Sequence, residues 1–385
     1  MRILIAHSRY RVPGGEDRYV EQQVSLLQER HKVSLAVTAS ASADRQAATA
    51  AGMAYSRARL KDARAAIANS NAQVVHVHNI YPGWGPAVHL AAARESVPLV
   101  MTVHNYRLRC PNGLTFTQGE PCTRCVGGAY YNAVVHRCFP TVAQSAVYAA
   151  SLWMHRFILR FEDRTSLFIA PSLFMRDRLV SWGLPSSKVR VIRNFTDSPL
   201  HDEGRGKGGL FAGRLSMEKG VDLLLRALVR AGDPPFTIVG DGPEGAALRS
   251  MARDLGLKNV SFTGLVTPET ARGFVSRCRF LVVPSLSDEN APLVALEAMA
   301  ASRPLLVSDR GGLPELARDG GGLVFRSGDV DALAAQIARL AQDDALCEAA
   351  GAAARERIRA EMTPEAHREA LEDVYRSVVA RAVVA

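Results

Sequence analysis

Short apolar segments rich in β-branched residues alternate with amphipathic segments along the whole chain, and this alternation runs twice. The pattern is typical of parallel sheets covered by helices. The first series of predicted strands comprises Arg2–His7, Val33–Thr38, Val74–His78, Leu99–His104, Leu167–Ala170 and Val189–Asn194. The second comprises Gly209–Ala212, Phe236–Val239, Val260–Thr263, Phe280–Pro284, Leu305–Ser308 and Gly322–Phe325. Between them, the polar and glycine-rich residues 196–209 (TDSPLHDEGRGKGG) are typical of a linker.

The repeated pattern predicts an α/β fold of two Rossmann-like, doubly wound domains that face each other across a cleft. With 385 residues, the chain is also too long for a single hydrophobic core. We expect an N-terminal domain at 1–195 with a cysteine-rich insert at 106–140, a C-terminal domain at 196–361, and a helix at 362–385 that packs back on the N-terminal domain. Open α/β sheets bind ligands at the carboxyl ends of their strands, so site residues are sought there.

The charge balance favours an anionic partner, because the formal net charge is +9 and the pI is near 9.5. Nucleic acid is not expected, since aromatic residues make up 6% of the chain and do not interleave with basic ones. The opening MRILIAHS lacks the apolar core of a secretory signal, and no run reaches the roughly 20 apolar residues that cross a bilayer. We therefore expect a cytoplasmic protein that does not span a membrane.

The loop after the first predicted strand, SRYRVPGGED at residues 8–17, contains a glycine pair. Gly14 and Gly15 would let the backbone approach an anion closely, and a helix from about Asp17 would direct its positive end there. A purely structural turn is the alternative interpretation.

The loop after the first strand of the second series, FAGRLSMEKG at residues 211–220, carries Arg214 and Lys219. Both cations can reach one diphosphate, the arginine with two donors and the lysine as a point charge. Solvated surface charge is the alternative. A later turn, VGDGPE at residues 239–244, is adequately explained as a tight turn, and we interpret it as structural.

The segment SDENAPLVALEAMA, residues 287–300, places Glu289 and Glu297 eight positions apart. A helix is expected to begin just after Asn290, its predicted N-cap, with Pro292 in the first turn. The N–H groups of that turn form an anion site, and Glu297 can reach back toward hydroxyls beside it. Two acids beside an anion site suit a ligand that is both phosphorylated and polyhydroxylated, as a nucleotide sugar is.

Four features together resemble a known family. They are E-x7-E at Glu289 and Glu297, G-R-x-x-x-x-K-G at Gly213–Gly220, the early Gly-Gly loop, and T-V-H-N at Thr102–Asn105. The chain resembles, over nearly its whole length, the retaining glycosyltransferases of the GT-B fold, family four (group 1). The resemblance implies transfer of a sugar from a UDP- or GDP-sugar donor, with retention of configuration and without a catalytic metal. The implied acceptor is a glycan or a lipid-linked molecule in cell-envelope polysaccharide or glycolipid synthesis.

The resemblance also implies roles for individual residues. The catalytic group would be His104, Glu289, Arg214 and Lys219, with the two cations neutralising the leaving diphosphate. The donor-binding group would be Gly14, Gly15, Arg214, Lys219, Glu289, Asn290, Ala291, Pro292, Leu293 and Glu297. In this scheme Glu297 holds the ribose, and Glu289 and His104 line the sugar site. The family commonly has E-G-F-G-L after the first acid, where this chain has ENAPL, a departure that bears on which sugar is bound.

Residue chemistry supports this reaction independently, because fixed cations stabilise the negative charge that builds on a departing diphosphate. An acid and nucleophile pair for hydrolysis would leave the phosphate-binding features unexplained. A nucleotide-sugar epimerase and a non-catalytic nucleotide-sugar-binding protein remain alternatives, because fold similarity does not exclude them.

Four of the six cysteines, Cys110, Cys122, Cys125 and Cys138, are spaced C-x11-C-x2-C-x12-C. In a reducing compartment this spacing predicts a closed, structural zinc site, with unliganded thiols and redox pairing as alternatives. The stretch SAVYAASLWMHRFILRF at residues 145–161 is apolar and flanked by basic residues. It predicts either an ordinary buried helix or a peripheral contact with an anionic membrane, at the inner face of the plasma membrane, where a lipid-linked acceptor would lie.

Overall fold

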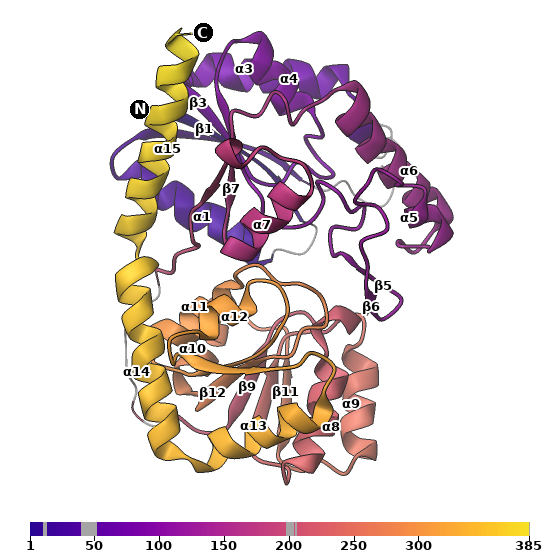
Figure 1. The fold of residues 1–385 in the computed structure, drawn as a ribbon, viewed down its shortest axis with the longest axis vertical. Coiled ribbons are helices and arrows are strands. Elements are labelled where there is room, and N and C mark those ends of the chain that lie inside the picture. Colours follow the sequence, from indigo (N-terminus) through magenta and orange to yellow (C-terminus); the bar gives the residue numbers. More distant parts are fainter. Residues whose placement is uncertain (11–13, 40–51, 198–203, 205, 385) are drawn as a thin grey trace. The chain divides into compact units, whose positions relative to one another are not determined.

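The computed structural model describes residues 1–10, 14–39, 52–197, 204 and 206–384, and these divide into two compact units (Figure 1). Unit 1 comprises Met1–Thr117, Cys122–Ile192 and Glu365–Ala385, and unit 2 comprises Gln118–Pro121 and Arg193–Pro364. The expected limits at 195/196 and 361/362 fall within a few residues of the unit limits. Residues 198–203 and 205 of the expected linker, and residues 11–13 of the glycine loop, lie outside the described residues.

Unit 1 is built on a parallel sheet that has six strands in the described part of the chain, in the order β2-β1-β3-β4-β7-β8. The strands are β1 (Arg2–Arg9), β2 (Lys32–Ala39), β3 (Val74–Val77), β4 (Leu99–Thr102), β7 (Leu167–Ala170) and β8 (Val189–Val191). The helices are α1 (Gly15–Gln28), α3 (Arg57–Ser70), α4 (Ala87–Arg94), α5 (Asn132–Val135), α6 (Val142–Trp153), the π-helix η2 (Met154–Ile158), α7 (Leu173–Ser181) and the 3₁₀ turn η3 (Ser186–Lys188). The order reverses between β1 and β3, which is the switch point where doubly wound sheets bind ligands.

The central strands of this sheet are largely apolar because helices cover both of their faces. Every residue of β3, β4 and β7 is buried. Three helices, α3, α6 and α7, begin where a side chain satisfies a backbone donor: Ser56, Thr141 and Ser172 each accept a hydrogen bond from the N–H of the residue three positions on.

Helix α15 (Pro364–Val384) packs on unit 1. Leu371 and Tyr375 are fully buried there, and the Tyr375 hydroxyl lies 2.7 Å from Nδ1 of His76 in β3. Tyr19 of α1 contacts His367 Nε2 at 2.9 Å through its hydroxyl. The last helix therefore completes the core of the unit that begins the chain.

Unit 2 is built on a second parallel sheet, six-stranded in the described residues, in the order β11-β10-β9-β12-β13-β14. The strands are β9 (Gly209–Ala212), β10 (Phe236–Val239), β11 (Val260–Gly264), β12 (Phe280–Val283), β13 (Leu305–Ser308) and β14 (Gly322–Phe325). The helices are the 3₁₀ turn η4 (Met217–Lys219), α8 (Val221–Arg230), α9 (Gly245–Asp254), α10 (Pro268–Arg277), α11 (Leu293–Ala300), α12 (Leu313–Ala317), α13 (Val330–Gln342) and α14 (Asp344–Glu361). Here the order reverses between β9 and β12.

Two hydrophobic clusters flank this second sheet. One joins α8, α9 and α13 to the sheet, and the other joins α10, α11, α12 and α14 to it. The doubly wound α/β fold expected from the sequence is thus confirmed in both units. Between residues 106 and 140 the short strands β5 (Phe116–Thr117) and β6 (Glu120–Pro121) form a separate two-stranded pairing. Among the described residues, none of the helices has the length and apolar character to cross a bilayer.

The start of α11 differs from the sequence-based expectation. The helix begins at Leu293, and its N-cap is Pro292 with φ −65° and ψ 131°, not Asn290. The residue before a proline is disfavoured in helical conformation, so Ala291 cannot open the helix. The Ala291 carbonyl instead accepts a 2.9 Å hydrogen bond from the Asn194 side chain. At the other end of the chain, α1 begins at Gly15, two residues earlier than expected.

Candidate functional site

The cationic loop and the acidic loop of unit 2 follow neighbouring strands. β9 pairs with β12 in parallel, with Gly209 opposite Phe280, and Arg214 and Lys219 follow β9 while Glu289 follows β12. Parallel strands bring their carboxyl ends to the same edge, so residues about 70 positions apart in the chain meet at the switch point.

Lys219 and Glu289 form an ion pair and a short hydrogen bond. Ser285 Oγ donates to the same carboxylate oxygen at 2.8 Å. Burial lowers the pKa of the Lys219 ammonium, but the charge of Glu289 and the hydrogen bond to it outweigh burial and raise that pKa above its usual value. The charge of Arg214 acts in the lowering direction, which places a second cation near the first. Lys219 therefore stays charged at neutral pH.

Close backbone packing holds these loops in place. A Cβ on Gly220 would lie 2.3 Å from the Pro284 carbonyl oxygen, and Gly220 has φ +66°. A Cβ on Gly240, with φ +121°, would lie 2.0 Å from the Gly213 carbonyl oxygen. The turn at 239–244 thus supports the Arg214 loop by backbone contact, in agreement with its structural interpretation.

The N-terminus of α11 adds backbone donors at this edge. The amides of Leu293 and Val294 occupy its first turn, where N–H groups lack intrahelical partners. Glu297 lies farther along the same helix and is 6% exposed. Asn290 is also nearly buried, while Ala291 and Pro292 are half-buried. The structure brings Arg214, Lys219 and Glu289 together, and it places Glu297 on the helix that begins beside them.

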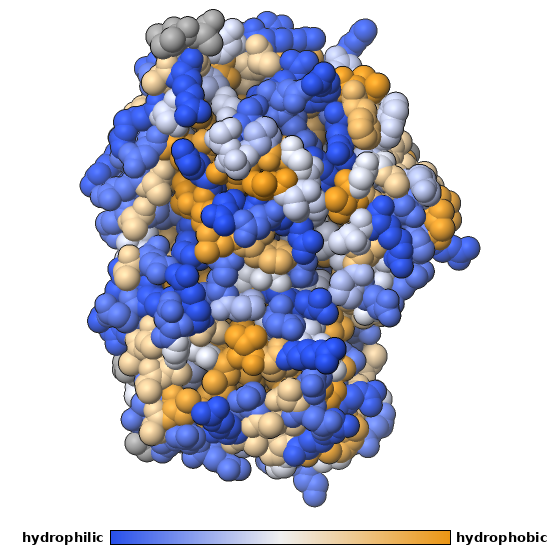
Figure 2. Space-filling view, viewed as in Figure 1, coloured by the Kyte–Doolittle hydropathy of each residue, from blue (hydrophilic) through white to orange (hydrophobic). Residues whose placement is uncertain are grey.

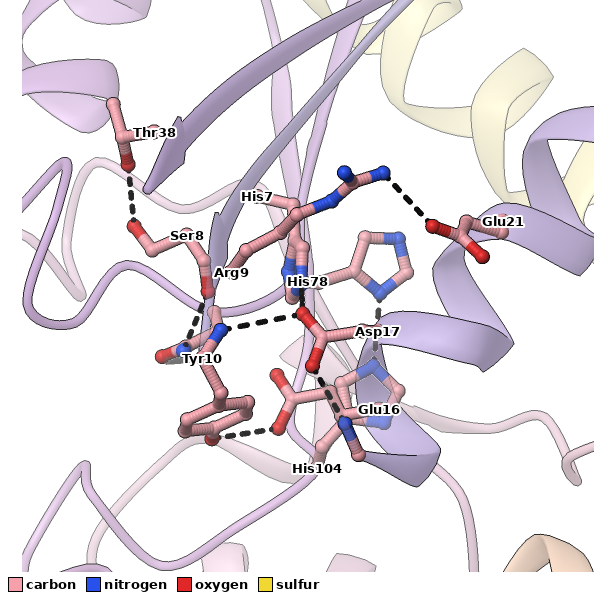
Figure 3. A network of polar contacts seen from close by, with 12 residues as sticks. His7, Ser8, Arg9, Tyr10, Glu16, Asp17, Glu21, Thr38, His78 and His104 are labelled. Carbon is pink, nitrogen blue, oxygen red and sulfur yellow. Dashed lines mark hydrogen bonds and ion pairs between the residues drawn. The ribbon is translucent and has the colours of Figure 1, made fainter. Parts of the chain in front are cut away.

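In unit 1, Asp17 organises the glycine loop (Figure 3). Its Oδ2 accepts a 2.9 Å bond from the Gly14 N–H, while Oδ1 accepts from the Tyr10 N–H at 3.3 Å and lies 2.9 Å from His7 Nε2. Burial raises the pKa of the Asp17 carboxyl, but the hydrogen bonds from His7 and from the Gly14 backbone outweigh it and lower that pKa. The pair of acids after the glycines, G-G-E-D, was the sequence signal for this anchor, and the sequence analysis assigned it no role.

Glu16, the other acid of that pair, is the second residue that the sequence analysis missed. Its Oε2 accepts a 2.9 Å bond from the Tyr10 hydroxyl and a 3.4 Å bond from the Asn105 amide. Burial raises the pKa of its carboxyl, against the lowering effect of His7 and of the Tyr10 hydrogen bond. Both acids lie at the carboxyl end of β1, where the T-V-H-N segment also contributes Asn105.

His104 is held by a network of neutral histidines. Its Nε2 lies 2.8 Å from His78 Nδ1, and Gln23 Nε2 lies 3.4 Å from His78 Nε2. Burial lowers the pKa of His104 to about 3 and that of His78 well below its usual value, so both are neutral at pH 7. The Gln23 amide nitrogen is assigned as the donor to His78 Nε2, so His78 carries its proton on Nδ1. His78 Nδ1 then donates to His104 Nε2, and His104 carries its own proton on Nδ1. His104 is thus suited to hydrogen bonding and not to proton transfer at neutral pH.

The structure is thus a two-unit α/β protein with an ion pair at the switch point of unit 2 and a network of buried acids and neutral histidines at the switch point of unit 1. Comparison with known families agrees: residues 13–198 match the family described as Glycosyltransferase Family 4, and residues 202–357 match Glycosyl transferases group 1. The chain belongs to these group 1, family 4 glycosyltransferases of the GT-B fold.

Several curated relatives carry glycosyltransferase names. An uncharacterised glycosyltransferase of Methanocaldococcus jannaschii is 32% identical over 48% of this chain and 52% of its own length. D-inositol 3-phosphate glycosyltransferase of Streptomyces griseus is 30% identical over 72% of this chain and 62% of its own length. Lipopolysaccharide core biosynthesis glycosyltransferase LpsD of Rhizobium meliloti is 31% identical over 57% of this chain and 65% of its own length. The chain thus spans between half and two thirds of the length of these relatives.

Solved structures share the fold. Sucrose-phosphate synthase from Thermosynechococcus elongatus superposes with a TM-score of 0.74 at 18% identity, over 99% of this chain and 100% of that chain. Anabaena HepE in complex with UDP-glucose superposes with a TM-score of 0.70 at 18% identity, over 97% of this chain and 99% of that chain.

Replacing Asp17 by Asn tests the anchor of the glycine loop. We expect a loss of about 1–3 kcal/mol in unfolding free energy at pH 7, because buried donors lose a charged acceptor. Urea unfolding followed by tryptophan fluorescence measures this loss. The signal reports on unit 1, because Trp84, Trp153 and Trp182 all lie in that unit. Glu21→Gln, in the exposed ion pair with Arg9, is the matched control and should cost no more than about 1 kcal/mol.

We also expect the stabilising effect of Asp17 on the free energy of unfolding to depend on pH. The native pKa of Asp17 is lowered, so its stabilising effect is complete above the unfolded value of about 3.9 and is lost as the pH falls through the native value. The difference in unfolding free energy between wild type and Asp17→Asn should therefore be constant from about pH 7 to 5 and should become smaller below about pH 4. A difference that stays constant through this acid range would contradict the assignment.

Proposed function

We propose that the protein is a retaining glycosyltransferase that moves a sugar from a nucleoside-diphosphate sugar, UDP- or GDP-linked, to a glycan or lipid-linked acceptor. The observation that carries the proposal is the Lys219–Glu289 pair with Arg214 beside it, at the switch point of unit 2. It joins cations for a diphosphate to a carboxylate for sugar hydroxyls. Relatives named for lipopolysaccharide core and amylovoran biosynthesis support a role in cell-envelope polysaccharide or glycolipid synthesis.

The proposed chemistry starts from charge compensation. Cleavage of the donor's glycosidic C–O bond places negative charge on the departing diphosphate, and Arg214 and Lys219 would stabilise that charge. Lys219 would then exchange part of its contact with Glu289 for a phosphate oxygen, which leaves the carboxylate to accept hydrogen bonds from the sugar. Two fixed cations and the α11 amides would supply the compensation that a divalent metal provides elsewhere, so the proposal includes no catalytic metal.

We assign the rest of the donor to the other predicted site residues. Glu297 would hold the ribose hydroxyls, with Asn290, Ala291, Pro292 and Leu293 lining the phosphate and sugar positions. In unit 1, no atom of the described residues lies within 4 Å of a Cβ built on Gly14 or Gly15, so packing against these residues does not require glycine at either position. Close approach of a phosphate would explain them. His104, with Nδ1 protonated, would donate to a sugar oxygen.

The identity of the reaction is tested with a panel of nucleotide sugars. The true donor should raise the thermal unfolding midpoint, because a ligand at about 100 times its Kd stabilises by about 2.7 kcal/mol. With the acceptor present, the product should keep the anomeric configuration of the donor by NMR, and EDTA should leave the rate unchanged. Inversion would contradict the mechanism. Isomerisation of the donor alone would indicate an epimerase, and binding without release of nucleoside diphosphate with any acceptor would indicate a binding protein.

Lys219→Ala should lower turnover at saturating donor by about 100-fold or more, by analogy with the loss of an oxyanion donor. Lys258→Ala, an exposed lysine of unit 2, is the matched control and should keep the wild-type rate. Initial rates at saturating donor, with the fold checked by circular dichroism, measure the effect. A rate within about threefold of wild type for Lys219→Ala would remove this residue from the site.

For the acceptor, we propose that α5, α6 and η2 contact an anionic membrane surface. Six large side chains of this region are exposed by 45–67%: Tyr131, Val135, Val142, Trp153, Phe157 and Ile158. Figure 2 shows apolar surface at the edge of unit 1 that these helices occupy. Arg156, Arg160 and Arg164 follow within the same stretch, which suits anionic headgroups. A lipid-linked acceptor would be met at such a surface.

Vesicle flotation tests this surface. Wild-type protein should float with phosphatidylglycerol vesicles and remain unbound with phosphatidylcholine. A Trp153→Ser, Phe157→Ser, Ile158→Ser variant should lose the binding, because it removes apolar area that would enter the interface. Leu265→Ser, which removes a 77% exposed apolar side chain of unit 2, should still float. Equal behaviour with both lipids would favour a soluble acceptor.

A further inference from the structure

The four cysteines of the insert converge although they are spread over residues 110–138. Cys110, Cys122, Cys125 and Cys138 all line one cavity of about 20 Å³ in unit 1, a volume suited to a single small occupant. The other two cysteines, Cys278 and Cys347, are buried in unit 2. All six are free thiols and lie in the described residues.

The insert at residues 106–140 has little regular structure of its own. Within the described residues it consists of two strands of two residues each and the four-residue helix α5. Its buried hydrophobic residues are Tyr106, Leu108, Phe116, Cys125, Tyr130 and Ala133. A metal ion bound by side chains from several of its turns would fix such a segment.

Two of the thiols make hydrogen bonds within the insert. Cys110 Sγ donates to Asn112 Oδ1 at 2.9 Å, and Cys138 Sγ donates to Thr117 Oγ1 at 3.6 Å. As these side chains stand, no group of three or more His, Cys, Asp or Glu residues in the described part of the chain is arranged to hold a metal ion. A thiolate cannot donate, so deprotonation removes both bonds and lets the sulfurs turn toward the cavity that all four line.

We propose that Cys110, Cys122, Cys125 and Cys138 bind one zinc ion as four thiolates and thereby fix the fold of residues 110–138. Four sulfur ligands complete the tetrahedral coordination of zinc and leave no position for water or substrate. The site is therefore structural, and it does not depend on the proposed transferase activity. His136 also lines the cavity but is not among the proposed ligands.

Metal analysis of the full chain tests the site. Protein purified under reducing conditions without added zinc should contain about one zinc ion per chain, and an organomercurial should release it stoichiometrically to a colorimetric zinc indicator. Cobalt substitution should give intense sulfur-to-cobalt charge-transfer bands, which require thiolate ligands. Zinc well below stoichiometric both as purified and after incubation with zinc and reductant would overturn the proposal. A thiol titration under denaturing conditions that finds two thiols fewer than the sequence contains would indicate a disulfide and would overturn the zinc proposal.

Single serine variants identify the ligands. Each of Cys110→Ser, Cys122→Ser, Cys125→Ser and Cys138→Ser should lower zinc content by about tenfold after dialysis against a weak chelator. Cys278→Ser and Cys347→Ser should keep the full zinc content. His136→Ala should also keep the full zinc content. If His136→Ala loses zinc while any of the four serine variants retains it, the four-sulfur ligand set is wrong. The cobalt spectrum of wild-type protein keeps the test valid if a variant fails to fold.

Discussion

Parallel pairing at the two switch points is the constraint on which the rest of the structure depends. Because β9 and β12 run in parallel, the loops after them start at the same edge, and Lys219 meets Glu289 across about 70 residues of chain. In unit 1 the pairing of β1 with β3 does the same for the glycine loop and the segment that carries His78. Neither site could be assembled by loops of an antiparallel sheet, whose strand ends alternate between edges.

The strands were predictable from the sequence because their apolar runs are short, β-branched and bounded by turn residues. The predicted run Phe280–Pro284 corresponds to β12 at Phe280–Val283, and Leu305–Ser308 matches β13. Helix starts were less predictable, as α11 shows. Asn290 has the chemistry of a cap, but the backbone restriction imposed by Pro292 on the residue before it moved the start to Leu293.

The site residues show the same division between local and long-range information. Arg214, Lys219 and Glu289 were predicted because each follows a recognisable strand. The Lys219–Glu289 ion pair depends on strand order, which spacing alone does not give. The contacts of His78 with Gln23 and His104 join three different elements. A histidine at the end of an apolar strand carries no sign of its partner, so its role became visible only in the structure.

The two units differ in the kind of polar group that they place at their switch points, and this difference follows from burial. In unit 1, burial keeps His104 and His78 neutral, and neutral donors and acceptors suit uncharged hydroxyls. In unit 2, Lys219 keeps its charge because Glu289 offsets the effect of burial, and a retained charge suits a phosphate. Burial therefore has opposite consequences at the two sites, depending on whether an opposite charge lies within hydrogen-bonding distance. On this argument the Lys219–Glu289 pair keeps the Lys219 ammonium charged, as the proposed contact with a diphosphate requires.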